Sequence, residues 1–195
     1  MAIALEKIQR LREQTMASLN DIKKALDEAK GDEQNALFIL KKKGKIIADK
    51  KSSRETKAGI ITSYMHGEGR IGVLLEVKCE TDFVAKNEEF KELAHDIALH
   101  IAAMDPRYVR PEDIPADVLA VEKKMFEEQT SELNKPAEIV NQIIEGKVKK
   151  YYDEVCLLNQ PFVKNDSMTV KDRIAESVSK LGENIEVGRF VRFAM

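Results

Sequence analysis

The sequence predicts an α+β fold: a three-helix module, then a small antiparallel sheet covered by helices, with a helical hairpin attached. Three observations predict this class. Apolar residues recur at helical spacing through residues 1–44, and they alternate with a period of two in segments after residue 58. The predicted strands and helices do not alternate along the chain, so the sequence does not indicate a parallel sheet. Charge separates the same two parts, because residues 1–57 carry a net charge of +5 and residues 58–195 a net charge of −7.

Three short helices are predicted for the N-terminal module, residues 1–44. Their apolar faces are Leu5, Ile8 and Leu11; Ile22, Ala25, Leu26 and Ala29; and Ala36, Leu37 and Leu40. Ser18 or Asn20 can cap the second helix and Asp32 the third, because short polar side chains accept from the free amides of a first turn. Gly31 and Gly44 are typical of helix ends, so we expect the third helix to stop at Gly44.

The next segment is basic. Eight basic and two acidic residues lie between Lys41 and Lys57, with little apolar periodicity after Ile47. We interpret residues 45–57 as a mobile linker that is partly helical. Such a charge run is usually only solvated, and the alternative is a weak contact with RNA or with an acidic partner surface.

The sheet is predicted from two alternating runs and a final strand. Residues 58–65 and 71–77 form a hairpin whose turn spans residues 66–69. The final strand alternates from Ile185 to Phe193, and its apolar set is Ile185, Val187, Val191 and Phe193. One face of this sheet should be covered by a helix that begins at Asn87, Glu88 and Glu89. Its covering residues are Phe90, Leu93, Ala94, Ile97, Ile101 and Met104.

The remaining chain is predicted to be mainly helical. A hairpin of two helices spans about residues 116–155 and turns at Asn134-Lys135-Pro136. Its apolar residues include Val118, Val121 and Met125 on one helix and Ile139 to Val155 on the other. Residues 155–163 follow as an extended segment, and a last helix runs from about Thr169 to Leu181 with Gly182 as its stop. Residues 58–195 thus form one α+β core domain.

Composition excludes several classes of function. A formal net charge of −2 gives no strong field toward nucleic acid or membrane, and no apolar run approaches the length of about 18 residues that a membrane span needs. The N-terminal residues lack the apolar region of a signal peptide, so we expect a soluble, cytoplasmic protein. Cys79 and Cys156 have no CxxC spacing, which indicates neither a disulfide framework nor a zinc site. We interpret both as buried or half-buried thiols, with a redox role as the less favoured alternative.

No enzymatic site is predicted. The phosphate-binding, nucleophile-elbow and HExxH motifs are absent from the sequence. His95 and His100 lie about 140° apart on one helix, so they do not share a metal ion as an i, i+4 pair could, and His66 falls in the predicted turn. We therefore expect no catalytic residues, no cofactor and no metal.

One segment calls for a function. CETDFVAKN, residues 79–87, must turn the chain from sheet to helix. In one interpretation Thr81 or Asp82 caps a helical turn and Phe83 is buried in the core. In the other, the turn protrudes from a rigid base, Phe83 enters a pocket of a partner, and Asp82 brings negative charge to a site there.

These residues resemble those of bacterial elongation factor Ts, the nucleotide exchange factor of elongation factor Tu. The resemblance runs nearly end to end. It rests on CETDFVAKN with HIAAMDP, on LREQT and KKALDEAKGD, on GRIGVLLEV, on LNQPFVKND and on GENIEVGRF. Together these motifs are specific, whereas TDFV alone is only suggestive.

The resemblance implies a function and its site residues. Residues 1–44 would dock on the GTPase domain of elongation factor Tu, and Arg12, Leu19 and Asn20 lie where that module touches the partner. Thr81, Asp82, Phe83 and Val84 would insert beside the bound nucleotide and disturb its magnesium. The family usually reads TGAGMM where this chain has residues 15–20, TMASLN, so Leu19-Asn20 replaces a methionine pair.

The resemblance to short members of the family also implies a homodimer in which the C-terminal strand region pairs with its twin. Some short members carry a cysteine near Val191, and this chain has none there. Besides elongation factor Tu and a second copy, we expect no nucleic acid or membrane partner. The rival hypothesis is a nucleic-acid or ribosome-associated protein that binds through the basic residues 41–57, and a hydrolase or metalloenzyme would need a convergent polar site that the sequence does not show.

Overall fold

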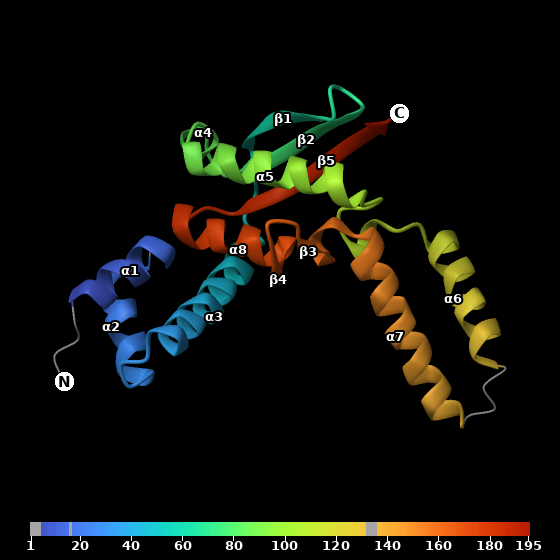
Figure 1. Cartoon of the computed structure of the whole chain (residues 1–195), viewed down its shortest axis with the longest axis horizontal. Helices are drawn as coiled ribbons and strands as arrows, with labels where there is room; N and C mark the ends of the chain where they lie inside the picture. Colours follow the sequence, from blue (N-terminus) through green and yellow to red (C-terminus); the bar gives the residue numbers. More distant parts are fainter. Residues whose placement is uncertain (1–4, 16, 132–135) are drawn as a thin grey trace.

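Three helices form the N-terminal part of the computed structural model, which describes residues 5–15, 17–131 and 136–195. They are α1 (Leu5–Thr15), α2 (Leu19–Glu28) and α3 (Glu33–Lys51) (Figure 1). Their shared core is Ile8, Leu11, Ile22, Ala25, Leu26, Ala36 and Leu40. Ser18 caps α2 and Asp32 caps α3, as predicted, whereas Leu5 is 78% exposed and lies outside this core.

The expectation that the third helix ends at Gly44 is wrong. Helix α3 continues to Lys51, so residues 45–51 of the predicted mobile linker are helical and only residues 52–57 connect α3 to the sheet. The reason is tertiary: α3 packs on α8 (Val170–Leu181), and Gly44 is buried beside Ser179. Lys45 also pairs with Asp172 at 2.8 Å, which supports the helix beyond its glycine.

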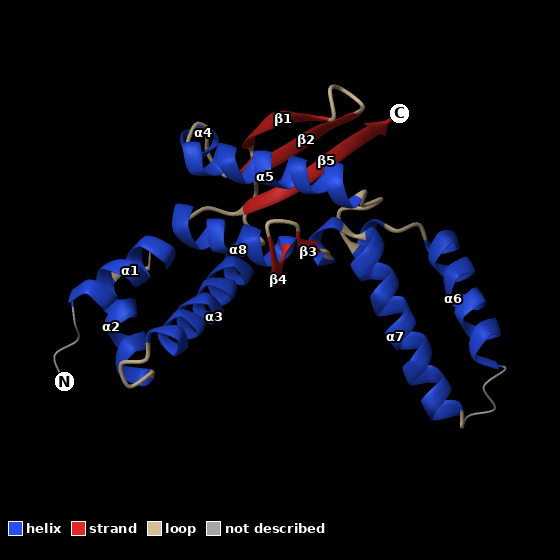
Figure 2. Ribbon diagram, in the orientation of Figure 1, coloured by secondary structure: helices blue, strands red, loops and turns tan. Residues whose placement is uncertain are grey.

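An antiparallel sheet of three strands occupies the centre of the chain. Its order is β1 (Ala58–His66), β2 (Ile71–Cys79) and β5 (Ile185–Ala194) (Figure 2). The hairpin is confirmed, but His66 pairs with Ile71 and therefore belongs to β1 rather than to the turn. Gly67 and Gly69 supply the positive φ angles that the short turn requires.

A β-bulge in β5 changes which residues of this strand face the core. Val187 pairs with Val77, but Phe190 pairs with Leu75, so two residues of β5 lie opposite Glu76 alone. The extra residue reverses the alternation. Ile185 and Val187 are buried as predicted, whereas Val191 and Phe193 are exposed and Phe190 packs against the core in their place.

Helices α5 (Glu88–Met104) and α8 cover the inner face of the sheet. Asn87 caps α5, and five of the six predicted covering residues are fully buried, while Met104 at the end of the helix is exposed. Thr169 and Gly182 bound α8 as predicted. The outer face of the sheet carries no covering helix among the described residues (Figure 1).

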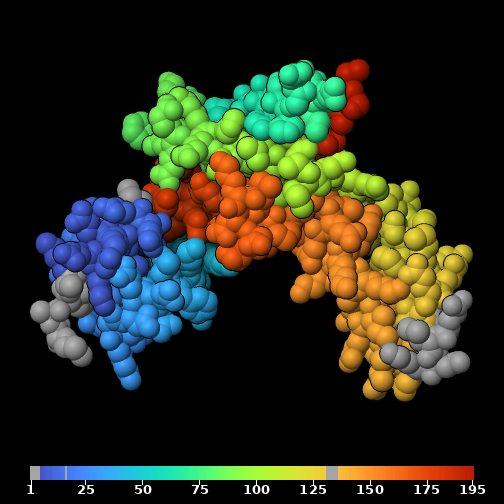
Figure 3. All heavy atoms as spheres, in the orientation of Figure 1, coloured from blue at the N-terminus to red at the C-terminus, as the bar shows by residue number. Residues whose placement is uncertain are grey.

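The helical hairpin consists of α6 (Ala116–Ser131) and α7 (Ala137–Val155), after the 3₁₀ turn η1 (Pro111–Asp113). It projects from the core, opposite the N-terminal helices, and the molecule is arched between the two projections (Figure 3). Val121, Met125 and Ile139 are exposed rather than packed within it. Asn134 and Lys135 of the predicted turn lie outside the described residues.

The segment after α7 is more structured than predicted. Instead of one extended stretch, it forms the 3₁₀ turn η2 (Leu157–Asn159) and a small hairpin of β3 (Pro161–Phe162) and β4 (Asn165–Thr169). This hairpin leads directly into the capping box at the start of α8. Among the described residues, no helix has both the length and the apolar character needed to cross a membrane.

Candidate functional site: an exposed turn between sheet and helix

The short helix α4 (Asp82–Ala85) joins β2 to α5. Thr81 is its N-cap: the Thr81 Oγ1 atom accepts from the Val84 amide at 3.4 Å. The amides of Ala85 and Lys86 then donate to the carbonyls of Thr81 and Asp82, which closes a single helical turn. We call residues Thr81–Val84 the TDFV turn.

The TDFV turn divides its side chains between core and solvent. Val84 is only 5% exposed and packs in the main core, whereas Phe83 is 83% exposed and Asp82 is also exposed. Neighbouring helical residues point about 100° apart, so burying Val84 directs Phe83 outward. The interpretation in which Phe83 is buried is therefore wrong, while its other half, a cap from Thr81, is confirmed.

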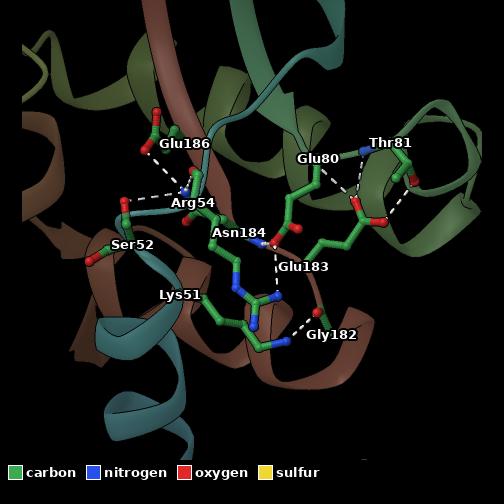
Figure 4. Close-up of polar contacts among 9 residues, drawn as sticks. All are labelled: Lys51, Ser52, Arg54, Glu80, Thr81, Gly182, Glu183, Asn184 and Glu186. Atoms are coloured by element: carbon green, nitrogen blue, oxygen red, sulfur yellow. Dashed lines mark hydrogen bonds and ion pairs between the residues drawn. The ribbon is translucent and has the colours of Figure 1, made fainter.

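A carboxylate from the far end of the chain holds the base of this turn. Glu183 Oε2 accepts from the amides of Glu80 and Thr81 at 3.1 and 3.0 Å, and Glu183 Oε1 accepts from the Thr81 hydroxyl at 2.7 Å (Figure 4). Glu183 lies in the connection between α8 and β5. Sequence reasoning missed it as a functional residue, because no local pattern joins positions 102 residues apart.

Glu80 makes the reciprocal contact, from the end of β2 to the segment that contains Glu183. Its Oε1 atom accepts from the Asn184 amide at 2.7 Å and lies 3.5 Å from an Arg54 nitrogen. The Asn184 side chain donates to the Arg54 carbonyl at 2.8 Å (Figure 4). Residues 80–81 and 183–184 are therefore joined in both directions, and the chain that leaves α3 is attached to the same junction.

Cys79 adds a further contact beneath the turn. Its Sγ atom donates to the Thr81 carbonyl at 3.2 Å. Burial, with a smaller contribution from the charge of Glu183, raises the pKa of the Cys79 thiol. Cys156 is buried too, and burial raises its pKa to about 11. Both thiols are buried, as the prediction of buried or half-buried cysteines allows.

The other predicted contact residues form a separate surface on the N-terminal helices. Arg12 is in the last turn of α1, and Leu19 and Asn20 begin α2, so all three flank one connection and are exposed. Met16 in that connection lies outside the described residues. In Figure 1 these helices and α4 are at the same end of the molecule, and the helical hairpin is at the other.

The predicted basic segment makes many contacts within the chain. Lys41 pairs with Glu176 at 3.1 Å, Lys45 pairs with Asp172, and Lys43 pairs with Asp21. Arg54 faces Glu80, and Lys51 donates to the Gly182 carbonyl. Lys57 pairs with Glu55 at 3.1 Å. Six of the eight basic groups therefore have partners that compete with phosphate.

The histidines are not gathered into a site. His95 packs edge-on against the Tyr64 ring, with centroids 5.5 Å apart, and His100 is buried beside Gln160. Within residues 5–15, 17–131 and 136–195, no group of three or more His, Cys, Asp or Glu residues is arranged to hold a metal ion.

The fold and site together define a protein in which a rigid α+β platform presents an exposed aromatic turn beside a helical module, a geometry suited to binding another protein. Comparison with known families places it more narrowly. The family model described as Elongation factor TS matches residues 2–195, and the chain belongs to this family.

Similar proteins extend over the whole chain. Elongation factor Ts of Rubrobacter xylanophilus is 51% identical over 195 residues, which cover all of both chains. Elongation factor Ts of Fervidobacterium nodosum is 51% identical over 192 residues, 98% of each chain. That of Thermotoga petrophila is 52% identical over 193 residues, 99% of this chain and 96% of its own. The resemblance read from the sequence is therefore confirmed.

Proposed function

We propose that this chain is a guanine nucleotide exchange factor for elongation factor Tu, which promotes GDP release when the TDFV turn inserts near the nucleotide's magnesium site. Membership of the elongation factor Ts family supports the exchange role. The observation that carries the detail is the 83% exposure of Phe83 on a turn whose next residue is buried. A single exposed apolar residue is ordinary, but one held on a fixed backbone is preorganised to enter a pocket of a partner, because little further ordering is needed on binding.

Exchange follows from linkage between two binding equilibria. A factor that binds nucleotide-free elongation factor Tu better than the GDP complex must weaken GDP binding by the same ratio. A thousandfold loosening requires about 4.1 kcal/mol of differential interaction. Burial of the Phe83 ring and loss of a magnesium contact together contribute a free energy of that order. The chain forms and breaks no covalent bond in this scheme, so it acts as a non-enzymatic factor without a cofactor.

The two residues at the tip have different roles. Asp82 brings a carboxylate toward a hard cation that prefers oxygen ligands and keeps part of its water shell, so it competes for that shell or reorients it. Phe83 separates the elements that hold the metal. Thr81 caps the turn, and Val84 fixes it to the core.

The N-terminal helices provide the second contact. Residues 1–44, through Arg12, Leu19 and Asn20, dock on the GTPase domain and hold the factor while the turn acts. Leu19 retains an exposed apolar side chain where the family pattern has methionine, whereas Asn20 replaces an apolar contact with a polar one. The protein would work in the cytoplasm, where translation takes place.

A homodimer is part of the proposal. Five exposed apolar side chains share the outer face of the sheet: Ile61, Met65, Leu74, Val191 and Phe193. Cross-strand pairing of Leu74 with Val191, and of Gly72 with both Met65 and Phe193, makes this patch continuous. Among the described residues β5 is also an edge strand, paired only with β2, so a second copy packed on this face would cover both features.

The nucleic-acid hypothesis gains no support from the structure. Lys41, Lys43 and Lys45 each pair with a carboxylate of the same chain, and binding a phosphate would require breaking that pair. Salt separates the two hypotheses. Neutralisation of several phosphates gives a steep salt dependence of affinity, whereas an apolar contact gives a shallow one.

The test is release of labelled GDP from purified elongation factor Tu, with and without this protein. Phe83→Ala combined with Asp82→Ala should leave the fold intact and slow stimulated release by about thirtyfold or more, the loss of a contact of about 2 kcal/mol. Val121→Ala removes an exposed apolar side chain from the helical hairpin and should release GDP at the wild-type rate. Unchanged release by the double variant would refute the role of the turn.

A further inference from the structure

We propose that Glu183 is a positioning residue for nucleotide exchange: its carboxylate fixes the direction in which the TDFV turn presents Phe83. This inference rests on the exchange function proposed above. Glu183 acts through the turn, and the contacts that carry the inference are the three hydrogen bonds of 2.7–3.1 Å that its two oxygens accept from Glu80 and Thr81.

The corner between β2 and α4 needs an acceptor at this place. Strand β2 ends at Cys79 and α4 begins at Asp82, so the amides of Glu80 and Thr81 lie beyond the sheet and before the helix. Amides at such a position have no partner within regular structure. A carboxylate serves both with one oxygen, and hydrogen bonds to an ionised acceptor are stronger than those between neutral groups.

The other oxygen of Glu183 sets the cap of the helix. The Thr81 hydroxyl donates to Glu183 Oε1, which leaves its lone pairs free to accept from the Val84 amide. Without Glu183 the hydroxyl proton is free to rotate, and both bonds weaken together. Because Phe83 lies between Thr81 and Val84, its direction depends on this cap.

Glu183 is itself held in place by its neighbours. Gly182 ends α8 with a φ of +79°, a conformation that favours glycine, and its carbonyl accepts from Lys51. On the other side, the Asn184 amide donates to Glu80, and the Asn184 side chain donates to the carbonyls of Ser52 and Arg54 (Figure 4). The residue is therefore fixed before any partner arrives.

The same junction relates the turn to the N-terminal helices. Lys51, Ser52 and Arg54 end α3 or follow it, and all three contact residues 182–184 or Glu80. If the turn and the N-terminal helices contact one partner at two places, their relative position must suit both. Loss of Glu183 should therefore lower the rate of exchange from the formed complex more than it lowers the affinity of docking.

A matched carboxylate separates positioning from stability. Glu186 lies three residues further on, where it accepts from the Asn184 side chain and from Thr56 but makes no described contact with the turn. Glu183→Ala and Glu186→Ala should both lower the unfolding midpoint, and only Glu183→Ala should change the maximal exchange rate.

The experiment measures stimulated GDP release from elongation factor Tu over a range of factor concentrations. Glu183→Ala should lower the maximal rate about tenfold, a change of about 1.4 kcal/mol, with the half-saturating concentration within about twofold of wild type. Glu183→Gln should keep part of the rate, because an amide oxygen still accepts from two amides. Adding Glu183→Ala to Phe83→Ala should cause no further loss, since the first change acts through the ring that the second removes.

The outcomes distinguish this inference from the function on which it rests. Slow release by Phe83→Ala with a wild-type rate for Glu183→Ala would overturn the inference alone. A wild-type rate for Phe83→Ala would refute the role proposed for the TDFV turn, and failure of the wild-type protein to stimulate GDP release would refute the exchange function itself. If Glu183→Ala does not fold, Thr81→Val removes the hydroxyl that links Glu183 to the Val84 amide and leaves the backbone amides of Glu80 and Thr81 bonded to Glu183. This variant should lower the maximal rate while Thr81→Ser retains it, and equal rates for these two variants would overturn the inference.

Discussion

The imidazole Nε2 of His100 lies 2.9 Å from Oε1 of Gln160 in the interior of the protein, where α5 meets the base of the helical hairpin. The Val163 amide donates to the other ring nitrogen, Nδ1, at 3.1 Å. The Gln160 amide group donates in turn to the Glu154 carbonyl at 2.7 Å. Because Nδ1 accepts a hydrogen bond, the ring is neutral and Nε2 carries its proton.

This buried histidine makes the stability depend on pH. Burial lowers the pKa of His100 below its ordinary value of 6.5. The unfolded chain therefore takes up a proton near pH 6.5 while the folded chain does not, so the free energy of unfolding falls as pH drops through and below 6.5. Because only one proton is involved, the free energy of unfolding changes by at most about 1.4 kcal/mol per pH unit.

Urea unfolding at pH 7.5 and pH 5.5 measures this effect. His100→Gln should flatten the pH dependence, although it also lowers stability at both pH values. If the free energy of unfolding depended equally on pH in the wild type and in His100→Gln, the pH dependence could not be attributed to His100.

Gly44 is predicted to tolerate alanine. A Cβ atom there would lie 3.4 Å from Ser179 Oγ, an ordinary van der Waals contact. Because glycine within a helix is unfavourable, Gly44→Ala should raise the free energy of unfolding by about 0.5–1 kcal/mol. Thermal unfolding tests this, with Gly59→Ala for comparison: there a Cβ would lie 2.3 Å from the Val77 carbonyl oxygen, so the midpoint should fall sharply.

Truncation tests the domain boundary. Deleting residues 1–44 should weaken binding to elongation factor Tu and leave the sheet-containing part folded, because the buried residues of the N-terminal helices form a cluster of their own. Some loss of stability is expected, since Lys41 and its contact with α8 are removed. Circular dichroism and binding assays follow the two effects, and loss of the whole fold would show that the boundary is wrong.

The outer face of the sheet provides a test of the dimer. Phe193 is 71% exposed there, so Phe193→Glu should not disturb the fold of one chain but should place a charge in the proposed interface. Sedimentation at micromolar concentration should give a dimer for the wild type and a mass near 22 kDa, that of one chain, for the variant. A wild-type mass of one chain would rule the dimer out at that concentration.

Much of the secondary structure was predictable because its causes are local. Thr169 and Gly182 bound α8, and Asn87 begins α5, because a cap bonds to amides two or three residues away and leaves a mark in the sequence. The alternation in β2 is equally clear, since every second residue from Val73 to Cys79 is buried. The TDFV turn was also found from sequence, as a break between a strand pattern and a helix pattern.

The features that prediction missed depend on contacts between distant segments. The sequence contains no sign that α3 passes Gly44, because the surface that supports it belongs to α8. An alternating pattern does not reveal a bulge, so only the pairing of β5 with β2 shows that Phe190 faces the core and Phe193 does not.

The sequence by itself determined the family, the periods of the helices and strands, and the place of the corner at residues 79–87. The tertiary structure decided that Phe83 points outward, and that a carboxylate more than a hundred residues away holds its turn. The physical reason is range: propensities and caps act within about four residues along the chain. Exposure and long-range hydrogen bonds exist only after distant segments have packed together.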